Sequence, residues 1–370
     1  MDWDALCFNI ATLIAGVFVL DYGADKFIDH TVIVGRRLGI SPTLIALLTA
    51  GAEYEELAVV VAALAQHRSP LALGNVLGST ISNILGAFSL GLLCRPGGME
   101  CDRSAKMYSA LLLFITTLFV ALALFHQLNR ISGAILIAVF VLYVASIGYA
   151  IYKGVTEPPA LSDSDSDSDS NSDAEIANPP RGQNSWTQAS ERSPLLDNAN
   201  PSLEPVPPPE TNAAQRLPRP LHHHITQLIY GLLALSLSGY ILAHSAGTLA
   251  DTLHLSGTVF GLTVVAFATT LPEKLLAVLA GARGHGGIVV ATTAGSNIFL
   301  LTLCVGVVAV AGIPVDQAND GLVLFDLVTV WLAAGCFAAV VFLGLGRGAG
   351  VVLLGLYGVF LGLELTVFRR

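Results

Sequence analysis

Two glutamates stand inside apolar stretches of the sequence, one in each half of the chain. Glu56 lies within residues 42–66, and Glu273 lies within residues 257–282. A charged group at the centre of a bilayer costs ~2.5–3.5 kcal/mol on insertion scales, so such a group usually faces a cavity or an ion path. The two glutamates are therefore the first candidates for binding a cation within a membrane.

A Gly-Ser pair follows each glutamate at the same distance. Ser79 lies 23 positions after Glu56, and Ser296 lies 23 positions after Glu273. An equal spacing in both halves indicates an internal repeat. Five predicted spans separate the two copies, so the repeats should insert with opposite orientations and place a substrate site near the midplane of the bilayer.

The elements that carry these residues are predicted to be membrane helices. The chain has 370 residues, of which 54% are hydrophobic and only 12% are charged, and this is not a soluble composition. A transmembrane helix needs ~20 mostly apolar residues, and Gly51 and Pro272 are the expected interruptions of the second and seventh helices. Ten stretches are long enough, near residues 6–32, 42–66, 70–94, 106–126, 131–152, 225–250, 257–282, 286–312, 321–345 and 349–368. The predicted fold class is all-α integral membrane, with ten transmembrane helices as two inverted five-helix repeats.

A polar, acidic segment separates the two groups of five spans. Ten of the 27 acidic residues fall between Asp163 and Glu210, together with a Ser-Asp alternation, and such a composition cannot bury enough surface to fold. We therefore divide the chain into a first repeat at 1–153, a disordered acidic linker at 154–220 and a second repeat at 221–370. Short loops carry more Lys and Arg on the side that faces the linker, which places the linker in the cytosol.

A short motif in the linker bears on localisation. Residues Glu191 to Leu196 read Glu-Arg-Ser-Pro-Leu-Leu and resemble an acidic dileucine signal, which cytosolic sorting adaptors read. A chance match in a polar segment is the alternative. We expect a multi-pass membrane protein of a vacuolar or lysosomal type of organelle, with the plasma membrane as the other option. The run His222–His224 is interpreted as a solvated patch beside the membrane and not as a metal site.

With these residues in view, the sequence resembles the calcium/cation antiporter superfamily. The two alpha-repeats of that superfamily carry Gly-Thr-Ser-x-Pro-Glu followed by Gly-Ser-x-x-x-Asn or Asp. In this chain, residues 269–273 read Thr-Thr-Leu-Pro-Glu, and residues 295–297 read Gly-Ser-Asn. The resemblance covers both five-helix halves and omits the linker. It implies exchange of Ca²⁺ for another cation by alternating access, with no resident cofactor.

The resemblance also implies a set of oxygen ligands. Glu56 and Glu273 match the two central carboxylates of the family, and calcium prefers six to eight oxygen ligands with irregular geometry. The matching supporting ligands would be Asn83, Ser79, Ser296, Thr269 and Thr270.

The chain departs from the family pattern in both repeats. Leu300 stands where the second repeat has an acid or amide, and Glu53 stands where the first repeat has a serine. We hypothesise that Glu53 restores the charge lost at Leu300, and we count it as a ligand. Lys274 could occupy or neutralise the cation site, or it could pair with Glu55 or Glu53; neighbouring helix positions do not share a face, which favours pairing away from the ion.

These observations predict a calcium:cation antiporter in which Na⁺ is the counter-ion. A Ca²⁺/H⁺ exchanger of an acidic organelle is the alternative, and a non-exchanging cation channel or sensor is an alternative from another class. The spans contain no HExxH and no GxSxG motif, so no enzyme is expected. The expected partners are the lipid bilayer, the transported ions and a possible sorting adaptor, with no nucleic acid.

Overall fold

The fold is helical throughout the part of the chain that the structure, a computed structural model, describes. Almost all of the predicted linker, the dileucine motif and the predicted helix interruption at Gly51 lie outside that part. The described residues are 3–39, 53–95, 103–152, 220–284, 286–312 and 322–368.

The described residues of the first half form three long continuous helices, one short helix and one span with a π-helical centre. In chain order these helices are α1 (Trp3–Arg37), α3 (Tyr54–Ala65), α4 (Ser69–Ile81), η1 (Ser82–Phe88), α5 (Ser89–Cys94), α6 (Arg103–Leu124) and α7 (Arg130–Tyr152).

The second half repeats this order of elements. Its helices are α8 (Leu221–Leu253), α9 (Gly257–Phe260), η2 (Gly261–Val265), α10 (Ala266–Thr269), α11 (Leu271–Ala282), α12 (Gly286–Phe299), η3 (Leu300–Cys304), α13 (Val305–Ala311), α14 (Leu324–Leu343) and α15 (Arg347–Thr366). In both halves a π-helical segment follows the helix that carries the Gly-Ser pair, and such segments are frequent at functional sites.

Eight helices among the described residues are long and apolar enough to cross a membrane, or up to nine if a bent pair counts as one span. The predicted all-α membrane fold is confirmed. The predicted number of ten is not, because the second predicted span is described only from Glu53 onward and α3 by itself has 12 residues. The predicted interruption at Pro272 is confirmed: α10 and α11 meet at a bend of 48°, with the proline in the first turn of α11, where its missing N–H costs no helical hydrogen bond.

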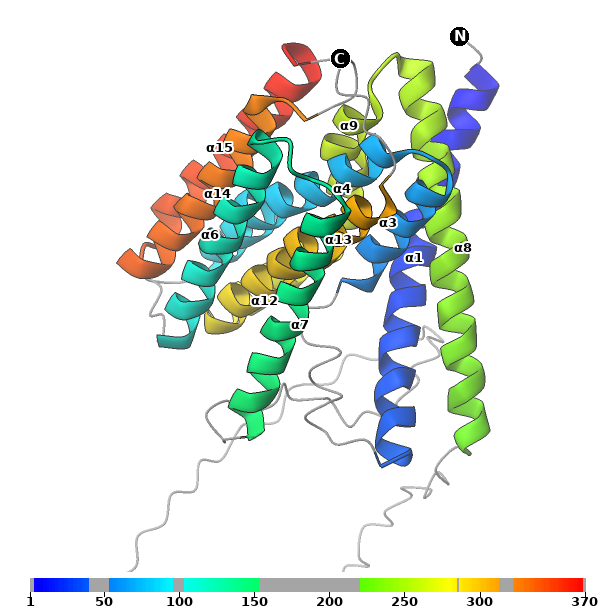
Figure 1. The fold of residues 1–370 in the computed structure, drawn as a ribbon, viewed down its shortest axis with the longest axis horizontal. Helices are drawn as coiled ribbons and strands as arrows, with labels where there is room; N and C mark the ends of the chain where they lie inside the picture. Colours follow the sequence, from blue (N-terminus) through cyan, green and yellow to red (C-terminus); the bar gives the residue numbers. More distant parts are fainter. Residues whose placement is uncertain are drawn as a thin grey trace, which may run out of the picture. The chain divides into compact units, whose positions relative to one another are not determined.

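The helices α1 and α8 lie side by side and run in opposite directions (Figure 1). At 1.5 Å per residue α1 is about 52 Å long, which exceeds the ~30 Å hydrocarbon core of a bilayer. The backbones of α1 and α8 approach closely because glycines lie where the two helices touch. A Cβ atom on Gly23 would lie 2.7 Å from the backbone nitrogen of Leu235, and one on Gly231 would lie 2.6 Å from that of Phe27. Small residues at such contacts are typical of membrane helices.

A histidine pair joins the same two helices. His30 on α1 and His224 on α8 are both buried, and their Nδ1 atoms are 3.2 Å apart. The expectation of a solvated histidine patch is therefore wrong for His224, although His222 is exposed. The reason is that α8 starts at Leu221 and turns this face toward α1.

The two halves also cross at α4, which packs against α9 and η2. A Cβ atom on Gly74 would lie 2.4 Å from the carbonyl oxygen of Thr258, and one on Gly78 would lie 2.3 Å from that of Leu262. Only glycine permits this approach. The crossing brings the helix that carries Ser79 against the span that carries Thr269 and Thr270.

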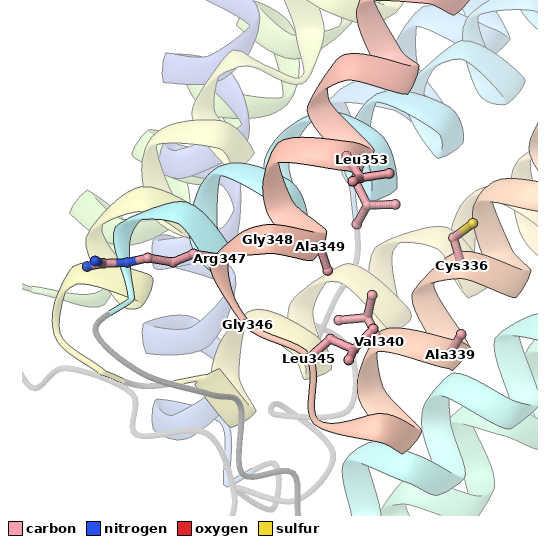
Figure 2. Close-up of a pocket in the computed structure, with 10 residues that line it drawn as sticks. Cys336, Ala339, Val340, Leu345, Gly346, Arg347, Gly348, Ala349 and Leu353 are labelled. Atoms are coloured by element: carbon pink, nitrogen blue, oxygen red, sulfur yellow. The ribbon is translucent and has the colours of Figure 1, made fainter.

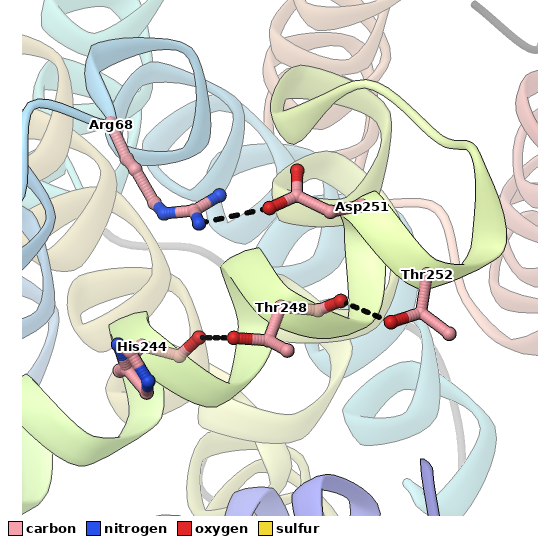
Figure 3. A network of polar contacts seen from close by, with 5 residues as sticks. All are labelled: Arg68, His244, Thr248, Asp251 and Thr252. Atoms are coloured by element: carbon pink, nitrogen blue, oxygen red, sulfur yellow. Dashed lines mark hydrogen bonds and ion pairs between the residues drawn. The ribbon is translucent and has the colours of Figure 1, made fainter. Parts of the chain in front are cut away.

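An ion pair ties the end of α8 to the turn between α3 and α4. Arg68 Nη2 lies 3.0 Å from Asp251 Oδ2, and the guanidinium points across to the last turn of α8 (Figure 3). A Cβ atom on Gly247 would lie 2.3 Å from Arg68 Cζ, so the arginine fills the notch that this glycine leaves.

An apolar hollow of about 460 Å³ lies at the turn between α14 and α15 (Figure 2). Side chains such as Val340, Leu345 and Leu353 line it. The guanidinium of Arg347 points away from these side chains, and its Nε donates to the backbone oxygen of Arg95 at 2.9 Å. No carboxylate lines this hollow, so it is not the cation site.

Candidate cation site

Both predicted carboxylates occupy the same place in a helix. The residue before α3 is Glu53 and the residue before α11 is Thr270, so Glu56 and Glu273 are each the third residue of a helix. The first turn of a helix leaves backbone N–H groups without partners and carries a partial positive charge, which favours a carboxylate. Each half of the chain thus places its predicted carboxylate in the first turn of a helix.

Glu56 is fully buried and collects donors from both halves. Its Oε1 accepts hydrogen bonds from Ser79 Oγ at 2.7 Å and from Thr269 Oγ1 at 2.6 Å, and its Oε2 accepts from Asn75 Nδ2. These three donors give both oxygens of the carboxyl group a hydrogen-bond partner. Asn75 was not among the predicted ligands, although its position four residues before Ser79 places it on the same helix face.

Glu53 forms a second cluster with residues from η1 and α12. Asn83 Nδ2 donates to Glu53 Oε1 at 3.1 Å, and the hydroxyl of Ser296 lies beside the same carboxyl group. Within the described residues, Glu53 Oε2 and Asn83 Oδ1 are buried without a hydrogen-bond donor. Buried acceptors without donors are costly and rare, and a cation would satisfy both.

The carboxyl group of Glu273 faces the carboxyl group of Glu55 rather than a hydroxyl. The carboxyl groups of Glu273 and Glu55 lie within hydrogen-bonding reach of each other. Glu273 Oε2 is buried and finds no donor among the described residues. Two carboxyl groups at this separation repel each other unless they share a proton or a cation lies between them. Glu55 was not predicted as a site residue, because nothing in its spacing distinguishes the side it faces.

Lys274 does not pair with Glu53 or Glu55 as the sequence suggested. Its Nζ instead donates to Ser82 Oγ at 2.8 Å and to the hydroxyl and backbone oxygens of Thr270. Thr270 therefore faces the lysine and not Glu56.

The described residues hold no group of three or more His, Cys, Asp and Glu side chains arranged for a metal ion. A cation bound here would have to use amide and hydroxyl oxygens together with the carboxylates. Leu300 is fully buried at the start of η3 and contributes no oxygen to that set.

Buried carboxylates at the starts and breaks of membrane helices are typical of ion-transporting membrane proteins. A family model described as "Sodium/calcium exchanger protein" matches residues 8–148 and 223–366. The chain belongs to this sodium/calcium exchanger family, within the calcium/cation antiporter superfamily.

Known proteins resemble the chain over nearly its whole length. "Putative antiporter CaxA" from Alkalimonas amylolytica is 27% identical over 330 residues, which cover 88% of either chain. "Sodium/calcium exchanger MaX1" from Methanosarcina acetivorans is 26% identical over 382 residues, which cover 95% of this chain and 97% of the relative. Among solved structures, the sodium-calcium exchanger NCX_Mj matches with a TM-score of 0.54 at 19% identity, covering 96% of this chain and 99% of its own. This last match supports the fold.

Proposed function

We propose that the chain exchanges Ca²⁺ for Na⁺ by alternating access at a carboxylate site near the midplane of the bilayer. The observation that carries the proposal is a set of buried oxygens without donors in the described residues: Glu53 Oε2, Asn83 Oδ1 and Glu273 Oε2. All three are acceptors, and each belongs to a group that can bind a hard cation.

The chemistry of these groups suits calcium. Ca²⁺ takes six to eight oxygens, tolerates irregular geometry and accepts carboxylate, amide and carbonyl ligands. In this proposal the central carboxylates are Glu56 and Glu273, and the charge that Leu300 lacks is supplied by Glu53. The remaining oxygens come from Asn83, Ser79, Ser296 and Thr269.

Exchange follows if both ions use the same carboxylates, because one ion must then leave before the other binds. The long pair α1 and α8 is the moving element in this proposal, since the two helices contact each other more extensively than they contact any other helix. The similarity to the sodium/calcium exchanger MaX1 supports Na⁺ as the counter-ion.

The test is ⁴⁵Ca²⁺ uptake into proteoliposomes that are loaded with Na⁺ and diluted into choline. Uptake above the equilibrium level is expected for the wild type and is expected to be lost in Glu56→Gln and Glu273→Gln. Glu364→Gln makes the same change on α15 and serves as the control. Undiminished uptake in the first two variants would contradict the site, and uptake that only equilibrates calcium would indicate a channel.

A proton is the second candidate for the counter-ion. It is favoured by the contact of Glu55 with Glu273, because a shared proton would stabilise two adjoining carboxyl groups. The dileucine-like motif supports this candidate indirectly, since sorting to an acidified organelle would supply a proton gradient. Calcium uptake that follows a pH gradient in the absence of Na⁺, and is lost in Glu55→Gln, would favour H⁺ over Na⁺.

A further inference from the structure

The ammonium group of Lys274 is buried at the break between α10 and α11. The side chain is 8% exposed, and its Nζ lies 2.8 Å from Ser82 Oγ and 3.1 Å from the carbonyl oxygen of Thr270. The hydroxyl of Thr270 is a third acceptor, and the ring of Phe267 lies beneath the charge, 4.8 Å from Nζ to the centroid. The acceptors come from α4's extension η1 in the first half and from the break in the second half.

The hydrogen bonds around this group account for every proton of an ammonium. Its three N–H bonds match the three nearest acceptors, which are Ser82 Oγ, Thr270 Oγ1 and the Thr270 carbonyl, while the Phe267 carbonyl lies farther from Nζ at 3.5 Å. Ser82 Oγ also accepts from the hydroxyl of Tyr357 at 2.9 Å, which leaves its own proton for Thr270 Oγ1 at 2.8 Å. Thr270 Oγ1 in turn donates to the carbonyl of Ala266. Every N–H and O–H group of this network has an acceptor when the side chain of Lys274 is charged.

No carboxylate among the described residues forms an ion pair with this ammonium. Glu273, its neighbour in sequence, turns its carboxyl group toward Glu55. The charged groups that act on Lys274 most strongly are Glu273 and Glu56, which are both proposed calcium ligands. The positive charge of Lys274 therefore lies beside the proposed calcium site and forms no salt bridge with a carboxylate of the described residues.

The oxygen atoms around the ammonium of Lys274 could also bind a small cation. The ammonium lies at the carboxyl end of the short helix α10, which carries a partial negative charge, and the Thr270 carbonyl there also accepts from the backbone N–H of Lys274 at 3.3 Å. In transporters with broken membrane helices, such ends and the unwound carbonyls beside them coordinate the coupling ion. Ser82 and Thr270 add two hydroxyl oxygens to this carbonyl end.

We propose that the ammonium of Lys274 is a resident monovalent cation, which fills a binding position formed by Ser82 and Thr270 that would otherwise bind Na⁺. This proposal rests on the proposed antiport function. Each transport cycle would then exchange one monovalent ion fewer per Ca²⁺ than a site without the lysine, because the protein supplies that charge itself.

The first test measures binding and does not require transport. Purified Lys274→Gln in detergent is titrated with NaCl against choline chloride while its thermal unfolding is followed. We expect a saturable rise of Tm with Na⁺ that exceeds that of the wild type, and we expect Ser82→Ala in the same background to abolish the gain. Lys106→Gln on α6 is the matched control and should behave as the wild type.

The second test measures stoichiometry in proteoliposomes. The Na⁺ gradient that just balances a fixed Ca²⁺ gradient should correspond to one additional Na⁺ per Ca²⁺ in Lys274→Gln. If the Gln variant does not fold, Lys274→Ala leaves more room for the ion and is titrated in its place.

The two hypotheses fail in different ways. Variants that gain no Na⁺-dependent stabilisation overturn the resident cation, whatever the wild type transports. A changed pH dependence of flux without an additional Na⁺ also overturns it and makes the lysine a proton carrier. Added Na⁺ binding in a protein that shows no Na⁺-coupled calcium flux supports the resident cation and refutes Na⁺ as the counter-ion.

Discussion

Thr269 Oγ1 donates a hydrogen bond to Glu56 Oε1 at 2.6 Å, across 213 positions of the sequence. This bond joins the carboxylate of the first half to the broken helix of the second half. Its geometry ties any movement of the second half at α10 to the carboxylate of α3.

Replacing Thr269 by valine keeps the shape of the side chain and removes this donor. A hydrogen bond to a charged group is worth ~1.5–3 kcal/mol. The affinity for calcium should therefore fall by about tenfold or more in this variant. The measurement is the KM for Ca²⁺ in the proteoliposome assay. Thr263→Val is the control, since the hydroxyl of Thr263 is also buried but donates only to the carbonyl of Val259. Equal KM values for the two variants would show that the bond plays no part in binding.

The proposed compensation between Glu53 and Leu300 predicts a rescue. Glu53→Ser removes one carboxylate next to Asn83 and Ser296, and calcium transport should fall to background. Adding Leu300→Asp returns one carboxylate from η3 and should restore part of the flux. The comparison is ⁴⁵Ca²⁺ uptake by the single and double variants at matched protein density. A double variant that stays inactive while Leu300→Asp by itself transports normally would reject compensation.

The ion pair of Arg68 with Asp251 should restrain α8 (Figure 3). The arginine side chain is 31% exposed and the aspartate 68%, so the pair contributes at most ~1 kcal/mol. If α8 moves during exchange, Asp251→Asn should raise turnover by up to about fivefold and leave Tm almost unchanged. Gly247→Ala displaces the guanidinium and should have the same effect.

Because both substitutions break one contact, their effects on turnover should not add. Thr248→Ala, one position along the same helix, is the control: its hydroxyl donates only to the carbonyl of His244. Additive changes in Asp251→Asn and Gly247→Ala would mean that the two residues act separately.

The contact of His30 with His224 predicts a dependence on pH. A hydrogen bond between two Nδ1 atoms requires that one of them be unprotonated. Acid therefore charges both rings and repels α1 from α8, with Lys26 and His223 adding repulsion and Asp29 opposing it. Spin labels at Leu38 and Ile225, which are both exposed, should move apart between pH 7.5 and pH 5.

The same labels on His224→Asn test the assignment. The asparagine leaves only one titrating ring in the contact, so the change in distance should be much smaller. An unchanged pH response in this variant would place the sensor elsewhere.

Much of the fold follows from local features of the sequence. Apolar runs of sufficient length predict the membrane helices, since the bilayer requires every backbone group to be bonded within its own helix. The spacing of 23 residues from Glu56 to Ser79 and from Glu273 to Ser296 predicts the repeat. Both rules depend on residues that are near one another in the chain.

The contacts inside the site depend on tertiary packing. Ser82 and Lys274 are 192 positions apart, and only the close crossing of α4 with η2 and the bend at Pro272 bring them together. The sequence predicts that a lysine stands beside Glu273, but not which way it turns. A side chain at a helix break has no fixed face, so the oxygens of the opposite half decide whether its charge meets a carboxylate or the hydroxyl and carbonyl oxygens that hold it here.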